Sequence, residues 1–117
     1  MSRLIKAFRN SVRAFGRLAR SETAFQQEIA LLVLSLPVGW FLAETWPGYV
    51  LLVASVVVLM IVEVLNTAVE AACDAISREF NADIQFAKDC GSLAVLLATV
   101  LVAGVWGLAL AERLGWV

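Results

Sequence analysis

The sequence has 117 residues, of which 62% are hydrophobic and 16% are charged. Soluble domains are about 45–50% apolar and about 25% charged, so this composition excludes an ordinary soluble domain, and the high hydrophobicity excludes a disordered chain. The length allows one domain of ordinary size. We therefore predict an all-α membrane protein in which residues 1–117 form a single domain.

The positive charge is concentrated at the amino terminus. Six of the nine basic residues lie within positions 1–20, where no acid occurs, and all ten acids follow from Glu22 onward. On a membrane protein such a basic arm favours lipid headgroups over nucleic acid as its partner. Apolar residues recur at helical spacing from Leu4 to Ala19, which predicts an amphipathic surface helix over residues 1–20. The same cations also suit the phosphates of a substrate, so the arm has two candidate roles.

Three apolar segments follow the arm. Positions 45–62 and 90–111 carry no charge, and each run is long enough for a membrane-spanning helix, which needs roughly 20 residues. The run at 29–43 is shorter and contains Pro37, so it spans a membrane only if it begins near Phe25; a re-entrant or interfacial segment is the alternative. We predict transmembrane helices at residues 26–43, 48–72 and 89–111, with a polar loop at 73–88.

The distribution of Lys and Arg predicts the orientation. The loop at 44–49 has neither residue, so the positive-inside rule places the amino terminus in the cytoplasm and this loop outside. The loop at 73–88 then lies inside and the carboxyl terminus outside. Trp106 falls close to a predicted span end, where interfacial aromatic residues are common. Cys73 and Cys90 lie near the reducing, cytoplasmic side, and we expect both to be free thiols packed as small hydrophobic groups.

The most informative segment lies at the inner end of the second predicted span. At about 100° per residue, Glu63, Asn66, Glu70 and Asp74 fall within roughly 60° of Glu63 around a helix. An ionisable group toward the bilayer centre costs at least about 2.5–3.5 kcal/mol. A polar network between helices accounts for Asn66 but not for three carboxylates that repel one another. Few cations are available to pair with them, which favours a divalent metal ion.

Further charged residues fall on the same predicted membrane face. The set comprises Glu22, Glu28, Glu70, Asp74, Lys88 and Asp89. Acids for Mg²⁺ together with cations for phosphates predict a phosphoryl-transfer site, although the sequence has no GxxxxGK[ST] loop and no GxGxxG in a strand context. A non-enzymatic transporter subunit or scaffold is the alternative from another class, because an acidic stripe also serves ion passage. Against it, the other half of each span offers no polar path.

Three blocks of the sequence resemble the prokaryotic diacylglycerol kinase family. They are Glu22-Thr-Ala-Phe-Gln-Gln-Glu28, Glu63-Val-Leu-Asn-Thr-Ala-Val-Glu70 with Asp74, and Ala87-Lys-Asp-Cys-Gly-Ser92. The resemblance implies a homotrimer with active sites between protomers, in the bacterial inner membrane, with the carboxyl terminus in the periplasm. It also implies that ATP, with Mg²⁺, phosphorylates the hydroxyl of diacylglycerol to phosphatidic acid at the cytoplasmic face. Undecaprenol kinases share the acidic motif and are the alternative; Gly91-Ser92 favours diacylglycerol.

The resemblance also implies a role for each site residue. Glu63 is expected to be the base and Asn66 to order the site, while Glu22 and Glu70 bind the metal ion. Nucleotide contacts are expected from Arg3, Glu22, Glu70, Glu79, Lys88 and Asp89. Lipid contacts are expected from Glu28, Glu63 and Ser92, with Asp74 and Gly91 in supporting positions.

Overall fold

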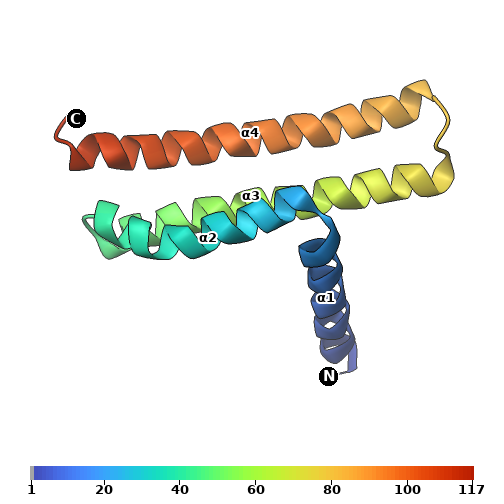
Figure 1. The fold of residues 1–117 in the computed structure, drawn as a ribbon, viewed down its shortest axis with the longest axis horizontal. Helices are drawn as coiled ribbons and strands as arrows, with labels where there is room; N and C mark the ends of the chain where they lie inside the picture. Colours follow the sequence, from blue (N-terminus) through green and yellow to red (C-terminus); the bar gives the residue numbers. More distant parts are fainter. Residues whose placement is uncertain (1) are drawn as a thin grey trace.

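The computed structural model describes residues 2–117, which form four α-helices without a strand (Figure 1). In chain order these are α1 (Ser2–Ser21), α2 (Thr23–Leu42), α3 (Trp46–Ile76) and α4 (Ala82–Arg113). The predicted all-α architecture is confirmed. Helices α2, α3 and α4 are long and apolar enough to cross a membrane, which indicates a multi-pass membrane protein.

Helix α2 contains the apolar run for which a re-entrant segment was the alternative. It begins at Thr23, ahead of the apolar residues, and continues without a break through Pro37. It therefore has the length that the shorter run at 29–43 lacked. The limits of the three predicted spans within α2, α3 and α4 stay predictions.

The loop between α3 and α4 is shorter than the predicted polar loop at 73–88, because only residues 77–81 separate the two helices. The polar residues on either side keep helical spacing, so they extend the helices. Asn81 then starts α4, its side chain accepting hydrogen bonds from the backbone N–H groups of Asp83 and Ile84 at 2.9 and 3.2 Å. The short loop holds the two long helices in a close hairpin.

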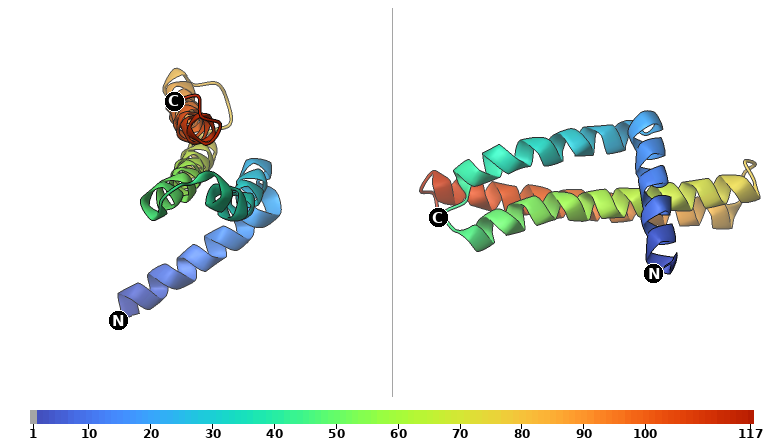
Figure 2. Two further views of the ribbon diagram at one scale, coloured as in Figure 1. Left: turned by 90° about the vertical axis from the view of Figure 1, so that its left-hand side faces the viewer. Right: turned by 90° about the horizontal axis from the view of Figure 1, so that it is seen from below.

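Helix α3 is the centre of the bundle, with α2 and α4 packed against it (Figures 1 and 2). The carboxyl terminus lies at the same end as the α2–α3 turn, and the α3–α4 loop lies at the opposite end. Helix α1 leaves the bundle near the start of α2 and crosses the direction of the other helices. The ring of Phe15 in α1 packs edge-on against Phe25 in α2, at 5.4 Å between centroids, and fixes this corner.

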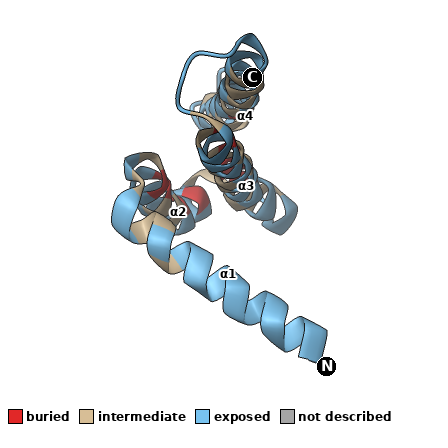
Figure 3. Cartoon of the chain, turned by 90° about the vertical axis from the view of Figure 1, so that its right-hand side faces the viewer, coloured by how far each residue is buried: buried red, intermediate tan, exposed pale blue. Residues whose placement is uncertain are grey.

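Little of the single chain is buried (Figure 3). Within the described residues the buried hydrophobic set is Phe25, Leu52, Val56, Leu59, Cys73 and Ala98, so α4 contributes Ala98 alone. Trp106 does not point outward as an interfacial residue. Its indole N–H lies 3.1 Å from both the Ser55 hydroxyl and the Leu52 carbonyl of α3. A buried polar N–H needs an acceptor, and two on α3 turn the ring inward.

Candidate active site

The polar stripe predicted on the second span lies along one face of α3. Its three central residues differ in environment: Glu63 is half-buried, Asn66 is buried and Glu70 is exposed. The Asn66 side chain donates a hydrogen bond from Nδ2 to Oε1 of Glu70, at 3.0 Å. This bond spans one helical turn and holds the Glu70 carboxylate in a defined position. Residues 2–117 supply no hydrogen-bond donor to the other Glu70 oxygen.

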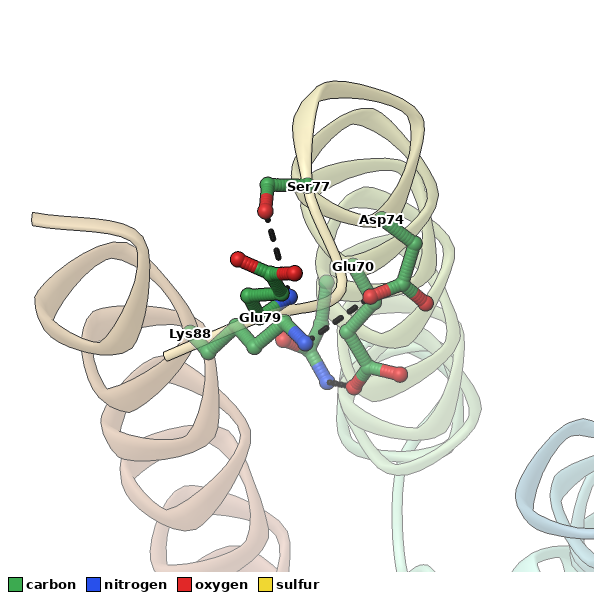
Figure 4. A network of polar contacts seen from close by, with 6 residues as sticks. Glu70, Asp74, Ser77, Glu79 and Lys88 are labelled. Carbon is green, nitrogen blue, oxygen red and sulfur yellow. Dashed lines mark hydrogen bonds and ion pairs between the residues drawn. The ribbon is translucent and has the colours of Figure 1, made fainter. Parts of the chain in front are cut away.

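Asp74 continues the stripe beyond the predicted span and has a cationic partner. Lys88 of α4 reaches across the helix pair and forms an ion pair with Asp74, at 2.9 Å between Nζ and Oδ1 (Figure 4). The hydrogen bond from Lys88 lowers the pKa of Asp74, and the same bond raises the pKa of Lys88. Both groups are partly exposed, so Lys88 keeps ammonium hydrogens that are available to a phosphate.

Helix α2 brings two further carboxylates toward Glu63. Glu22 lies at the α1–α2 corner, and its side chain makes no capping hydrogen bond with α2. The negative charges of Glu22 and Glu70 both act on Glu63, and the charge of Glu63 acts on Glu28. Glu28 is 6% exposed, and its Oε1 has no hydrogen-bond partner among the described residues. One chain thus brings three carboxylates, those of Glu22, Glu28 and Glu70, toward Glu63.

Other predicted site residues lie outside this group. Arg3 is exposed on the first turn of α1, the helix that contacts α2 but neither α3 nor α4. Glu79 is exposed in the α3–α4 loop, where its backbone N–H bonds to the Ser77 hydroxyl at 3.1 Å (Figure 4). Asp89 and Ser92 are exposed on α4. Among residues 2–117, no hydrogen bond or ion pair joins these four side chains to the carboxylates of Glu22, Glu28, Glu63 or Glu70.

The sequence interpretation missed the burial of Glu28. The spacing of Phe25, Glu28, Ser35 and Gly39 places them on one face of α2, and this spacing can be read from the sequence. All four residues are buried. The last two of these residues are small, and the rings of Tyr49 in α3 and Trp106 in α4 lie against Gly39. The cysteines were predicted alike but differ, since Cys73 is buried and Cys90 is exposed; both are free thiols.

The donor set suits a hard divalent cation only in part. Glu22 makes no capping hydrogen bond and the second oxygen of Glu70 has no protein donor, so both residues offer carboxylate oxygens, which are the ligands that Mg²⁺ prefers. Among residues 2–117, however, no group of three His, Cys, Asp or Glu side chains is close enough to hold a metal ion alone. Mg²⁺ is usually bound by one or two carboxylates, with waters and substrate phosphates as the remaining ligands. The residues present fit that mode.

Comparison with known proteins identifies the family. The sequence model described as prokaryotic diacylglycerol kinase matches residues 9–110, which is most of the chain. The chain belongs to the prokaryotic diacylglycerol kinase family. Membership makes it a lipid kinase, and this decides against the non-enzymatic alternative. Kinases of this family carry out ATP-dependent phosphoryl transfer, usually with a divalent metal ion.

Curated relatives cover nearly the whole chain. A diacylglycerol kinase of Haemophilus influenzae is 36% identical over 107 residues, covering 92% of this chain and 91% of the relative. One of Escherichia coli K12 is 36% identical over 114 residues, covering 97% and 93%. One of Pseudomonas aeruginosa is 33% identical over 106 residues, covering 91% and 86%. The similarity therefore includes all three helices that carry the carboxylates and Lys88.

Proposed function

We propose that this chain phosphorylates the hydroxyl of diacylglycerol with ATP and Mg²⁺, at the cytoplasmic face of the bacterial inner membrane, to give phosphatidic acid. The observation that supports it most is the cluster of Glu22, Glu63, Asn66 and Glu70 at one end of a membrane bundle, in a member of this family. Phosphoryl transfer depends on positioning and on neutralising charge more than on covalent chemistry. Acids that bind Mg²⁺, with a lysine beside them, supply both the positioning and the positive charge.

On the donor side, we assign Glu22 and Glu70 to the metal ion. Bound Mg²⁺ would neutralise the phosphate oxygens as charge shifts during transfer. Asn66 orients Glu70 through the bond to Oε1 and leaves the second oxygen free for a ligand. Lys88, which forms an ion pair with Asp74 on the same face of α3, adds positive charge. Arg3, Glu79 and Asp89 are assigned to the nucleotide from the family resemblance.

On the acceptor side, we assign Glu63 as the base. Glu70 lies seven positions further along α3, so the two Cα atoms are about 10.5 Å apart along the helix. That spacing suits one acid at the lipid hydroxyl and the other at the phosphates. Since the pKa of an alcohol lies far above neutrality, Glu63 accepts its proton only as the new P–O bond forms. Glu28 beside Glu63, and Ser92 on α4, are assigned to the lipid.

We also propose a homotrimer with its amino terminus in the cytoplasm, its carboxyl terminus in the periplasm and α1 on the membrane surface. The exposed Glu70, the few metal ligands in one chain and the single buried residue of α4 all support a site completed by another copy. The basic residues of α1 support the orientation. The carboxyl terminus and the α2–α3 turn lie at one end of the bundle, as that orientation requires.

The lipid substrate is tested by a parallel assay. The curated relatives are diacylglycerol kinases, and both this and the Gly91-Ser92 pair favour diacylglycerol over undecaprenol. The purified protein in mixed micelles is given ATP and Mg²⁺ with either lipid at matched mole fraction. We expect faster phosphorylation of diacylglycerol. Faster phosphorylation of the polyprenol would reverse the assignment while leaving a lipid kinase.

A further inference from the structure

Helices α3 and α4 come into close contact beside Asn66. A β-carbon built on Gly91 of α4 would overlap the Asn66 Oδ1 atom and would lie 3.1 Å from Asn66 Cγ. Gly91 has negative φ, so no backbone conformation requires glycine here. The close approach is therefore the reason that a side chain at position 91 does not fit.

This contact explains the environment of Asn66 Oδ1, which is buried without a hydrogen-bond partner among the described residues. The oxygen lies close to where a β-carbon would stand, so it faces a Cα–H bond of Gly91. Contacts of a Cα–H group with an oxygen recur where helices pack closely. The opposite orientation of the amide would direct its NH2 group at this C–H bond and its oxygen at the Glu70 carboxylate. Gly91 thus favours the orientation in which Nδ2 donates to Glu70.

We propose that Gly91 is a positioning residue: it fixes the Asn66 amide and, through it, the Glu70 carboxylate for metal–nucleotide binding. The inference rests on the proposed assignment of Glu70 to the metal ion. It differs from a purely structural role, because the group that Gly91 contacts is the end of a side chain. A methyl group at position 91 displaces the amide by rotation and leaves both helix backbones in place.

The consequence is that affinity and stability respond in opposite ways to Gly91→Ala. Alanine favours a helix more than glycine does, so we expect thermal stability to be retained or raised. Displacing the amide removes the bond to Glu70, and we expect Mg²⁺–nucleotide affinity to fall by about tenfold, as when a hydrogen bond to a charged group is lost. If Gly91 served only helix packing, Gly91→Ala would instead lower thermal stability and leave Mg²⁺–nucleotide affinity unchanged.

The chain offers matched controls on the same helix. A β-carbon on Gly104 or Gly107 meets nothing within 4 Å. We therefore expect Gly104→Ala and Gly107→Ala to leave nucleotide affinity unchanged. A second control removes the amide itself: in an Asn66→Ala background, Gly91→Ala has no side chain to displace and should change affinity by less than about twofold, since its effect acts through Asn66.

The experiment measures binding and unfolding on the full-length protein in detergent. Mn²⁺ serves as the metal probe, titrated by electron paramagnetic resonance with a non-hydrolysable ATP analogue, and the thermal midpoint is recorded for each variant. Weaker binding in Gly91→Ala than in Gly104→Ala, with no loss of thermal stability, supports the proposal. Equal binding in these two variants would overturn it, and so would an equally large effect of Gly91→Ala in the Asn66→Ala background. Failure of the wild-type protein to bind the metal–nucleotide pair at all would instead overturn the assignment of Glu70.

Discussion

At the scale of single residues, the acids of α3 occupy three different settings. Glu63 is half-buried among other carboxylates, Glu70 is exposed and held by Asn66, and Asp74 is paired with Lys88. We therefore expect the three carboxylates to have different chemical uses, although they share one helix face.

The first prediction separates the roles of Glu63 and Glu70. Glu63→Gln should abolish lipid phosphorylation while Mg²⁺–ATP still binds, because the amide keeps the shape of the side chain but takes no proton. Glu70→Gln should weaken Mg²⁺–ATP binding, because one proposed metal ligand loses its charge. Nucleotide affinity and turnover are measured for both variants in the folded protein. If Glu63→Gln lost affinity and Glu70→Gln retained it, the two roles would be exchanged.

The second prediction concerns the Asp74–Lys88 pair and pH. The pKa of Asp74 is lowered in the folded state, so the pair contributes stability above the ordinary aspartate pKa of about 3.9 and loses it as the pH falls. Both side chains are partly exposed, so the contribution is small. Asp74→Asn should lower the thermal midpoint slightly at neutral pH, and the difference from wild type should vanish in acid. A difference that persists or grows below the aspartate pKa would contradict this account.

At the scale of elements, α4 is held against α3 by a few specific contacts. Ala98 is its one buried residue among those described, and its polar links to α3 are the Lys88 ion pair at one end and the Trp106 indole toward the other. Within a membrane, lipid tails are as apolar as the side chains, so polar contacts and close packing decide how helices associate. These links fix the rotation of α4 about its axis, and with it the position of Gly91 beside Asn66.

The third prediction tests the Trp106 link. Trp106→Phe removes the N–H that both Leu52 and Ser55 accept, and should destabilise the protein by about 1 kcal/mol, within the range for hydrogen bonds between membrane helices. Ser55→Ala should cost less, because the Leu52 carbonyl still accepts the bond. The measurement is reversible unfolding in mixed detergent micelles. Equal stability of Trp106→Phe and wild type, or a larger cost for Ser55→Ala, would contradict this role.

At the scale of the whole molecule, the sequence predicts the helices better than their contacts. Helices α3 and α4 follow from charge-free runs of membrane length, whereas α2 reaches that length by beginning at Thr23, ahead of its shorter run. Asn66 and Glu70 share a face because their spacing on one helix requires it. The Gly91–Asn66 contact and the burial of Glu28 depend on how each helix is rotated against its neighbours. Periodicity within one helix leaves that rotation free, so these features needed the structure.

The fourth prediction concerns orientation in the membrane. Trp46 lies at the start of α3 beside the α2–α3 turn, at the end of the bundle that we assign to the periplasm. Trp46→Cys, in a background where Cys73 and Cys90 are replaced by alanine, should react with a membrane-impermeant maleimide from the periplasmic side. Labelling from the cytoplasmic side instead would contradict the proposed orientation.

We propose that the acids of α3 catalyse phosphorylation of a lipid alcohol. The most direct test follows labelled γ-phosphate from ATP into lipid, with diacylglycerol and Mg²⁺ in reconstituted bilayers, for the wild-type protein and for Glu63→Gln. We predict labelled phosphatidic acid from the wild-type protein and none above background from the variant, with equal amounts of folded protein in both. No labelled lipid from the wild-type protein, or an undiminished yield from Glu63→Gln, would contradict the account.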